Sequence, residues 1–334
     1  MRRRHNPKAG KGAALLAVLW LTAALSAIAL TVASTVRSET ERSSTDGDGL
    51  KAYYLACGAI DRMLLYIELG PKFLGPGGKA VFQETTRLLP LGFPTGFVRA
   101  EYIPETSKLD VNNVQPRMLN NLLLALGVDP PRAEAVTAAI VDWRRPGGAI
   151  TQFDQHYLSL VPSFRARHAS LQEIEELLLV QGVTPDLFYG SYTRDATGAL
   201  VPHAGLRDCL SVYGGITGFD VNTVQPAVML ALGISPNTVS GIVALRQIAP
   251  IHDMGQLAAF HEGGAGLGQL GISNGTVATL RATAQLRLAN GQLSDVRRTV
   301  SAVVKFLEQD SPLLQPGSLP YHILRWYDNA APLQ

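Results

Sequence analysis

Cysteine is scarce in this sequence, since Cys57 and Cys209 are the only two among 334 residues. Two cysteines are too few for a disulfide-rich scaffold or for a structural zinc site built from cysteine. They are enough for one disulfide in an oxidising compartment, and the sequence leaves open whether the two side chains meet.

Sequence patterns typical of enzymes are also missing. The seven histidines have no metal-ligand spacing, and the chain contains no nucleophile elbow, phosphate-binding loop or dinucleotide fingerprint. Asp208 and Cys209 are adjacent, but no histidine lies beside them in the sequence to act as a base. We therefore expect no enzymatic activity, no catalytic residues and no cofactor-binding residues.

Charge is low and unevenly placed. Charged residues make up 17% of the chain, and residues 1–12 hold five lysines and arginines with no acidic residue. The formal net charge of the whole chain is +2, so subtracting the leader's +5 leaves −3 for the remainder. Nucleic-acid binding needs clustered positive charge, so no nucleic-acid partner is expected for this body.

No charged residue occurs from Ala13 to Val36. A helix of this length spans about 36 Å, against about 30 Å for the hydrocarbon core of a bilayer. The basic cluster before it predicts a cytoplasmic amino terminus, with the body across the membrane. A cleaved secretory signal usually has a shorter apolar region, whereas a plain membrane anchor fits the length equally well.

A third interpretation rests on the junction between the leader and the apolar run. Gly12 ends the basic leader, and the apolar helix begins at Ala13. This resembles the processing site of type IV pilin-like proteins, which implies cleavage between Gly12 and Ala13 by a prepilin peptidase and methylation of the new amino terminus at Ala13. Such proteins usually have glutamate at the fifth position after the cut, where this chain has Ala17. A carboxylate in lipid needs a partner, and a tip subunit has no subunit above it, so the missing glutamate either opposes the pilin interpretation or marks a tip subclass.

Residues 37–70 read as further helix, with Leu55, Ala59 and Met63 at helical spacing and Gly70-Pro71 as the end. The glycines of residues 45–49 predict an interruption or kink. Strand-like composition predicts strands at residues 79–82, 96–103, 276–288, 294–307 and 321–326. Asn290-Gly291 predicts a hairpin turn between the third and fourth of these strands.

The clearest signal is an internal repeat. Residues 109–116 read Leu-Asp-Val-Asn-Asn-Val-Gln-Pro, and residues 219–226 read Phe-Asp-Val-Asn-Thr-Val-Gln-Pro. Each copy continues to Leu-Ala-Leu-Gly and then to Asp-Pro or Ser-Pro. Proline at a first turn, glycine after a helix and Asp or Ser as an N-cap predict two short-linked helices per copy. The repeat units span residues 109–145 and 219–248.

These units resemble the helix-hairpin-helix family, whose DNA-binding members present backbone amides from a Gly-x-Gly turn to a phosphate. Both turns here lack the second glycine, and Arg132 is the only basic residue in either. We therefore expect the units to pack against protein. The alternative is a membrane-anchored helix-hairpin-helix protein that binds or takes up DNA.

The order of these features, from Gly12 to about Phe260, is informative as a series. An apolar helix without the usual glutamate leads to an asparagine-containing hairpin, Asp142-Trp143, a predicted helix capped by Ser170 and Glu173, and a second hairpin. This series resembles the minor pseudopilin K family of type II secretion systems. The resemblance implies an α+β fold, in which a long N-terminal transmembrane, pilin-like helix packs on a small antiparallel sheet and a large helical domain with two helix-hairpin-helix-like units is inserted.

The resemblance also implies a division of the chain and a role. The parts are a leader at 1–12, a transmembrane helix at 13–36, its continuation at 37–70, a sheet domain from 71–109 and 276–334, and an inserted domain at 110–275. The protein would be a single-pass inner-membrane protein with a periplasmic body, contacting I- and J-type minor pseudopilins through its N-terminal helix. It would lie at the tip of a pseudopilus and help initiate or cap this filament during protein export across the outer membrane. The sequence does not decide between a secretion pseudopilus and a related pilus.

Calcium is a further implication of the resemblance, in the inserted domain. The acid-rich stretch expected after Asp142-Trp143 is replaced here by Arg144-Arg145-Pro146. Calcium takes six to eight oxygen ligands and several carboxylates, which Asp154 and Glu173 alone do not supply. We therefore predict no metal ligands and no cofactor.

Overall fold

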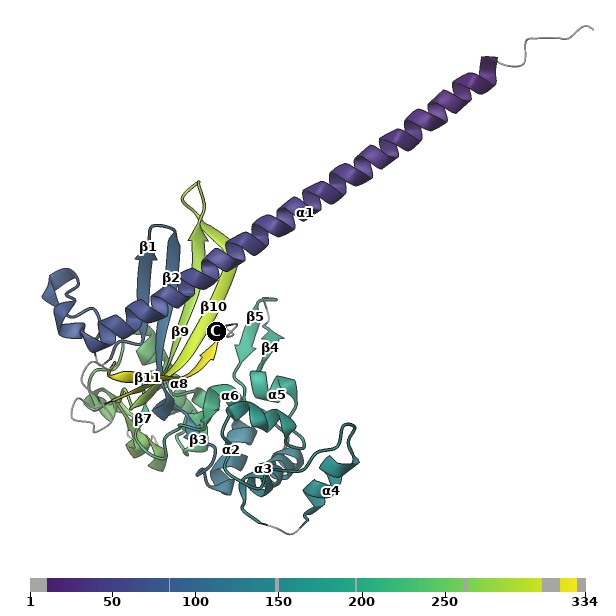
Figure 1. The fold of residues 1–334 in the computed structure, drawn as a ribbon. Helices are drawn as coiled ribbons and strands as arrows, with labels where there is room; N and C mark the ends of the chain where they lie inside the picture. The colour runs from purple at the N-terminus through teal and green to yellow at the C-terminus, as the bar shows by residue number, and fades with distance from the viewer. Residues whose placement is uncertain are drawn as a thin grey trace, which may run out of the picture.

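The computed structural model describes residues 11–83, 85–147, 150–195, 197–260, 264–307 and 319–328. A long helix crosses one face of a sheet and extends far beyond it, and a mainly helical part lies at the other end of the sheet (Figure 1). Most of the expected basic leader, residues 1–10, lies outside the described residues.

The long helix is α1 (Lys11–Glu68), and it is continuous. The predicted interruption at residues 45–49 is therefore wrong. Gly49 is buried where α1 passes Arg298, and a Cβ atom there would lie 2.8 Å from the Arg298 Nη2 atom. The glycine lets α1 pass close to the sheet. Glycine destabilises a helix interior, but packing of the next turns of α1 on the sheet offsets this loss.

The five-stranded sheet is antiparallel throughout, in the order β1-β2-β9-β10-β11. Its strands are β1 (Leu88–Phe93), β2 (Gly96–Pro104), β9 (Val277–Arg287), β10 (Leu293–Phe306) and β11 (Tyr321–Tyr327). Strands at four of the five predicted positions are confirmed, as is the hairpin turn, where Gly291 has a φ of +82°.

The prediction of a strand at residues 79–82 is wrong, because that segment makes only an isolated bridge between Leu74 and Ala80. The first strand is β1, which no pattern in the sequence indicated. Its third residue is Pro90, which argues against a central strand, and β1 does lie at the edge of the sheet.

Small residues bring α1 close to the sheet. Ala52, Ala56 and Ala59 of α1 are fully buried, and the same core contains alternate residues of β9. These are Ala278, Leu280, Ala282 and Ala284. The intervening β9 residues face the other side of the sheet, where polar side chains collect.

Residues 105–276 lie between the neighbouring strands β2 and β9, and most of them form the helical part. Its helices are α2 (Pro116–Ala125), α3 (Pro130–Arg144), α4 (Gln152–Ser159), α5 (Pro185–Tyr189), α6 (Leu206–Cys209), α7 (Pro226–Ala231) and α8 (Pro236–Ile248). Three two-stranded pairs join them: β3 (Leu109–Asp110) with β6 (Leu210–Ser211), β4 (Ser191–Arg194) with β5 (Leu200–His203), and β7 (Phe219–Asp220) with β8 (Leu270–Gly271).

Short 3₁₀ helices complete the fold. They are η1 (Gly70–Lys72), η2 (Pro76–Gly78), η3 (Glu105–Ser107), η4 (Ile174–Leu179), η5 (Met254–Ala259) and η6 (Ala265–Gln269). The α-helix predicted after Ser170 is only η4, and its N-cap is Glu173. The Glu176 carboxylate accepts hydrogen bonds from the backbone N–H groups of Gln172 and Glu173, at 2.8 and 3.2 Å, and so closes this shorter helix.

The helical part has its own hydrophobic core, separate from the core between α1 and the sheet. Cys57 packs on the sheet core and Cys209 lies in the helical core, and both thiols are free. The expected α+β class, with a long N-terminal helix and mixed helical and antiparallel sheet structure, is confirmed.

Candidate functional site

The amino-terminal half of α1 is an exposed apolar surface. Every described side chain from Ala14 to Val36 is exposed, and Trp20 retains 76% of its accessible surface. Among the described residues, α1 is the one helix long and apolar enough to cross a membrane. An apolar surface of this length needs cover from lipid or from other helices.

Gly12 and Ala13 fall in the first turn of α1, which begins at Lys11. The residue that replaces the expected glutamate, Ala17, lies one turn further along the exposed part of the helix. Cleavage between Gly12 and Ala13 stays a prediction.

The two repeats build the same local structure around an asparagine. The Asn112 side chain donates to the Leu171 carbonyl at 3.0 Å and accepts from the Leu171 N–H at 2.7 Å. Asn222 makes the same two bonds with Ile251, also at 3.0 and 2.7 Å. Each asparagine thus binds the chain that follows its helix pair as a neighbouring strand would.

An arginine at the end of the second helix of each pair completes this structure. Arg144 donates to the carbonyls of Val111 and Val114, and Arg246 donates to those of Val221 and Val224. Burial lowers the pKa of both guanidinium groups. Sequence reasoning missed these roles of Arg144 and Arg246. The one feature that could have indicated them is an arginine near the end of the second helix in each repeat.

The turns between the paired helices follow the sequence prediction. Gly127 and Gly233 both have a φ of +85°, and Asp129 and Ser235 cap the next helices by accepting backbone N–H groups. Arg132 donates from Nη2 to the Gly182 carbonyl at 3.3 Å and to Thr184 Oγ1 at 3.2 Å. The one base of these turns is thus engaged within the protein, which favours packing over phosphate binding.

The repeats differ at their aspartates. Asp110 accepts from the Asn112 N–H at 2.8 Å and from Asn113 Nδ2 at 2.6 Å, so it serves its own turn. Asp220 is fully buried and pairs with Arg87, the residue before β1. This ion pair fastens the second repeat to the sheet.

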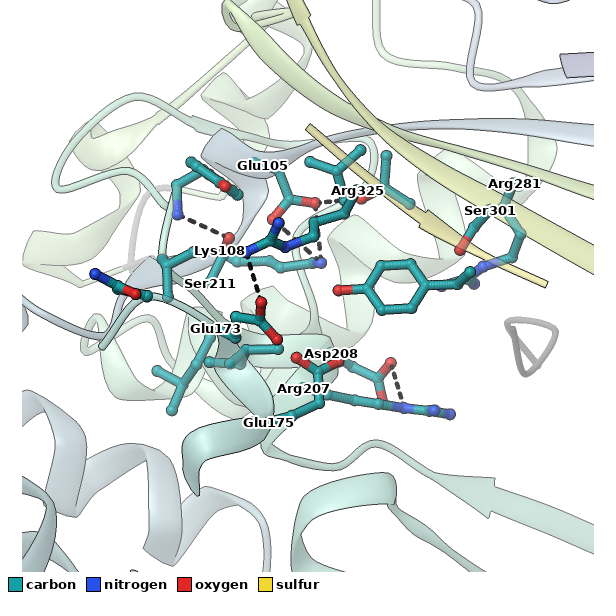
Figure 2. A pocket seen from close by; sticks show the side chains of 18 of the residues that line it. Glu105, Lys108, Glu173, Glu175, Arg207, Asp208, Ser211, Arg281, Ser301 and Arg325 are labelled. Carbon is teal, nitrogen blue, oxygen red and sulfur yellow. Dashed lines mark hydrogen bonds and ion pairs between the residues drawn. The ribbon is translucent and has the colours of Figure 1, made fainter. Parts of the chain in front are cut away.

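A polar pocket of about 440 Å³ lies where the helical part meets the sheet (Figure 2). Glu105 accepts from Lys108 Nζ at 3.1 Å and from Thr279 Oγ1 at 2.6 Å at its wall. Burial opposes the charge of Glu105, but Lys108 and the hydrogen-bond donors outweigh it and lower the carboxyl pKa. Arg325 of β11 reaches Glu173 of the helical part across the same pocket.

Ion pairs line this pocket, among them Lys108 with Glu105 and Arg325 with Glu173. Asp208 and Cys209 are an adjacent acid and nucleophile in the sequence. Cys209 is fully buried, and that burial strongly raises the pKa of its thiol, which disfavours the reactive thiolate.

The two acids considered for calcium are engaged separately. Asp154 accepts from the Thr151 N–H at 2.9 Å and lies 3.0 Å from His168 Nε2, whereas Glu173 pairs with Arg325. In the part of the chain that the structure describes, no three metal-ligating side chains come together. Asp154 and Glu173 therefore do not combine into one calcium site with several carboxylates among the described residues.

Comparison with protein families identifies residues 101–189 as matching protein K of the type II secretion system (T2SS), first domain. The fold matches a chain in the crystal structure of the GspK-GspI-GspJ complex from the enterotoxigenic Escherichia coli type 2 secretion system. The TM-score is 0.53 at 13% identity, covering 87% of this chain and 100% of that chain. Comparison with curated proteins gave no significant match. The two matches confirm the resemblance to type II secretion minor pseudopilin K.

Proposed function

We propose that this chain is the K-type minor pseudopilin of a type II secretion system. It would sit at the tip of the pseudopilus and help initiate or cap the filament during protein export across the outer membrane. One combination carries the proposal: a segment that matches protein K lies in the same chain as a long exposed apolar helix. Its own side chains would perform no chemical reaction.

The partners follow from the same combination. The solved complex joins GspK, GspI and GspJ, and its matched chain shares the fold of this protein. We infer that α1 packs against the N-terminal helices of I- and J-type minor pseudopilins, because its exposed half offers an apolar surface without cover in the monomer. The body would be periplasmic and the helix would lie in the inner membrane.

Two features support tip placement. The segment 110–275, taken as an inserted domain, adds bulk at the end of the sheet away from the protruding half of α1, where it would obstruct another subunit above it (Figure 1). Its two helix pairs would be helix-hairpin-helix-like units used for packing. Ala17 also replaces the carboxylate that a shaft subunit would use to meet its neighbour.

The amino terminus of the mature protein is the first test. Mass spectrometry of the full chain, produced with an active prepilin peptidase, should show a start at N-methylated Ala13. Production without the peptidase should leave the leader attached, and Gly12→Val is the matched variant that should resist cleavage. An intact leader beside active peptidase would reduce the protein to a plain membrane anchor.

Filament position needs a second test. Trp20→Cys should form a disulfide with a cysteine placed on the N-terminal helix of an I- or J-type partner when the three are produced together. The same variant should give no disulfide-linked dimer of two copies of this chain. Such a dimer would contradict placement at the tip, because it requires neighbouring K-type subunits along the shaft.

A further inference from the structure

A second pocket, of about 400 Å³, lies between the polar face of the sheet and the α7–α8 pair. Carboxylates line it at two positions, Glu101 and Asp208. Five positive side chains also line it: Arg87, Arg99, Lys108, Arg246 and Arg281. Arg87 is paired with Asp220 and Lys108 with Glu105, so the donors of interest belong to the other three. We call this the arginine pocket.

Arg281 is the central group of the arginine pocket. Its β9 neighbours Leu280 and Ala282 are buried on the α1 side, so Arg281 projects from the opposite face. Figure 2 shows it beside Ser301, at the edge of the polar pocket of about 440 Å³, which it also lines.

The guanidinium of Arg281 has unused donors. Its Nε and Nη1 atoms are buried and have no hydrogen-bond partner among the described residues. The Glu101 carboxylate is 3.9 Å from Nη1, which is too long for a hydrogen bond, and Glu101 also pairs with Arg99 at 3.2 Å. Unmet donors on a buried cation are costly, so an added oxygen ligand would be favourable here.

Donors from two further elements converge on the same space. Arg246 of α8 uses Nη1 for the two repeat carbonyls, while its Nε and Nη2 make no hydrogen bond within the described chain. Arg99 of β2 stands at the rim with 58% of its side chain exposed. A group entering the pocket would therefore meet guanidinium donors from β2, β9 and α8.

We propose that the arginine pocket is a binding site for an oxyanion group, a carboxylate or a phosphate. The planar guanidinium fork matches both groups, and its donors are strongest toward an anionic oxygen in a partly dry site. The source would be either a free small anion or an acidic group on a polypeptide. This site stands apart from the proposed function and depends on none of its steps.

Isothermal titration calorimetry on the full chain in non-ionic detergent tests the site. The titrants are inorganic phosphate, succinate and a short aspartate-rich peptide, all at constant ionic strength. Arg281→Gln should weaken binding by about tenfold or more, and Arg281→Lys should lie between, because lysine keeps the charge without the fork. Arg297→Gln removes the same charge from an exposed position on β10 and should leave binding unchanged.

The titrants also separate the two sources. Binding of phosphate or succinate identifies a free oxyanion site, whereas binding of the peptide alone identifies a polypeptide carboxylate. Equal affinity of the wild type and Arg281→Gln, or no binding by any of the three, would overturn the proposal. If circular dichroism shows that Arg281→Gln does not fold, Arg99→Gln at the rim replaces it, with an expected loss of about threefold or more.

Discussion

The Asp220 carboxylate binds the Arg87 guanidinium through both oxygens, with Nη2 to Oδ1 at 2.8 Å and Nε to Oδ2 at 3.0 Å. Asp220 is fully buried, and the Arg87 side chain is 10% exposed. The aspartate belongs to the second repeat, and the arginine precedes the first strand of the sheet. A buried pair of this geometry is costly to break from one side, because the remaining charge loses its partner.

Asp220→Ala should therefore lower the free energy of unfolding by about 3–5 kcal/mol. Asp110→Ala, the matched change in the first repeat, should cost only about 1 kcal/mol, because Asp110 bonds within its own turn. Denaturant unfolding of both variants in detergent measures the difference. Equal losses would show that the link to the sheet adds little to stability.

The paired asparagines carry a second prediction. Asn112→Ala should destabilise the fold by about 1–3 kcal/mol, because the Leu171 N–H and carbonyl lose their partners. Asn222→Ala should cost a similar amount through Ile251. The neighbouring Asn113→Ala is the control, since the Asn113 side chain is exposed and, among the described residues, donates to Asp110 alone. Denaturation midpoints test this, and a cost for Asn113→Ala as large as that for Asn112→Ala would oppose it.

Local features of the repeats were readable from the sequence. The caps at Asp129 and Ser235 and the left-handed glycines at 127 and 233 depend on residues within a few positions of one another. Hairpin chemistry at Asn290-Gly291 is equally local. Such elements form from nearby donors and acceptors, so their spacing in the chain predicts them.

Long-range relationships were not readable in the same way. The partners Arg87 and Asp220 are far apart in the chain, and nothing near either residue indicates the other. The same holds for Gly49, because the side chain that leaves no room for a larger residue there is Arg298 on β10. It also holds for Arg281, because the residues that surround it come from β2 and α8. Residue propensity alone suggested a broken helix at Gly49, and tertiary packing overrode it.

Gly47 and Gly49, two of the glycines of α1, allow a test of that explanation. Gly47→Ala should stabilise the protein by about 0.5–1 kcal/mol, because it removes backbone freedom from a helix interior and nothing lies within 4 Å of the new Cβ. Gly49→Ala should gain less, because its Cβ would meet the Arg298 guanidinium at 2.8 Å. Thermal unfolding in detergent compares them. A larger gain for Gly49→Ala would mean that close passage of the sheet does not explain this glycine.

The pair of His168 and Asp154 predicts a pH dependence of stability. Burial opposes the charge of His168, but hydrogen bonding to Asp154 and to the Asp142 carbonyl outweighs it and raises the pKa of the imidazole. The Thr151 N–H, aided by His168 and opposed by burial, lowers the pKa of Asp154.

The sign for each group follows from its unfolded value. The histidine contribution is fully present below about pH 6.5 and is lost as the pH rises through the raised folded pKa. The Asp154 contribution is present above about pH 3.9 and is lost as the pH falls through the lowered folded pKa. Between those limits both groups are charged, and the pair stabilises the fold most.

The melting temperature of the wild type should consequently fall as the pH rises from 6 to 8.5, and His168→Gln should flatten this part of the profile. His252→Gln is the matched control, because His252 meets the Thr85 hydroxyl rather than a carboxylate, and it should keep the wild-type slope. Differential scanning calorimetry across this range decides the matter. A His168→Gln profile parallel to the wild type would show that the imidazole is not charged in the folded protein, since only a charged ring gains from the Asp154 carboxylate and loses that gain on deprotonation.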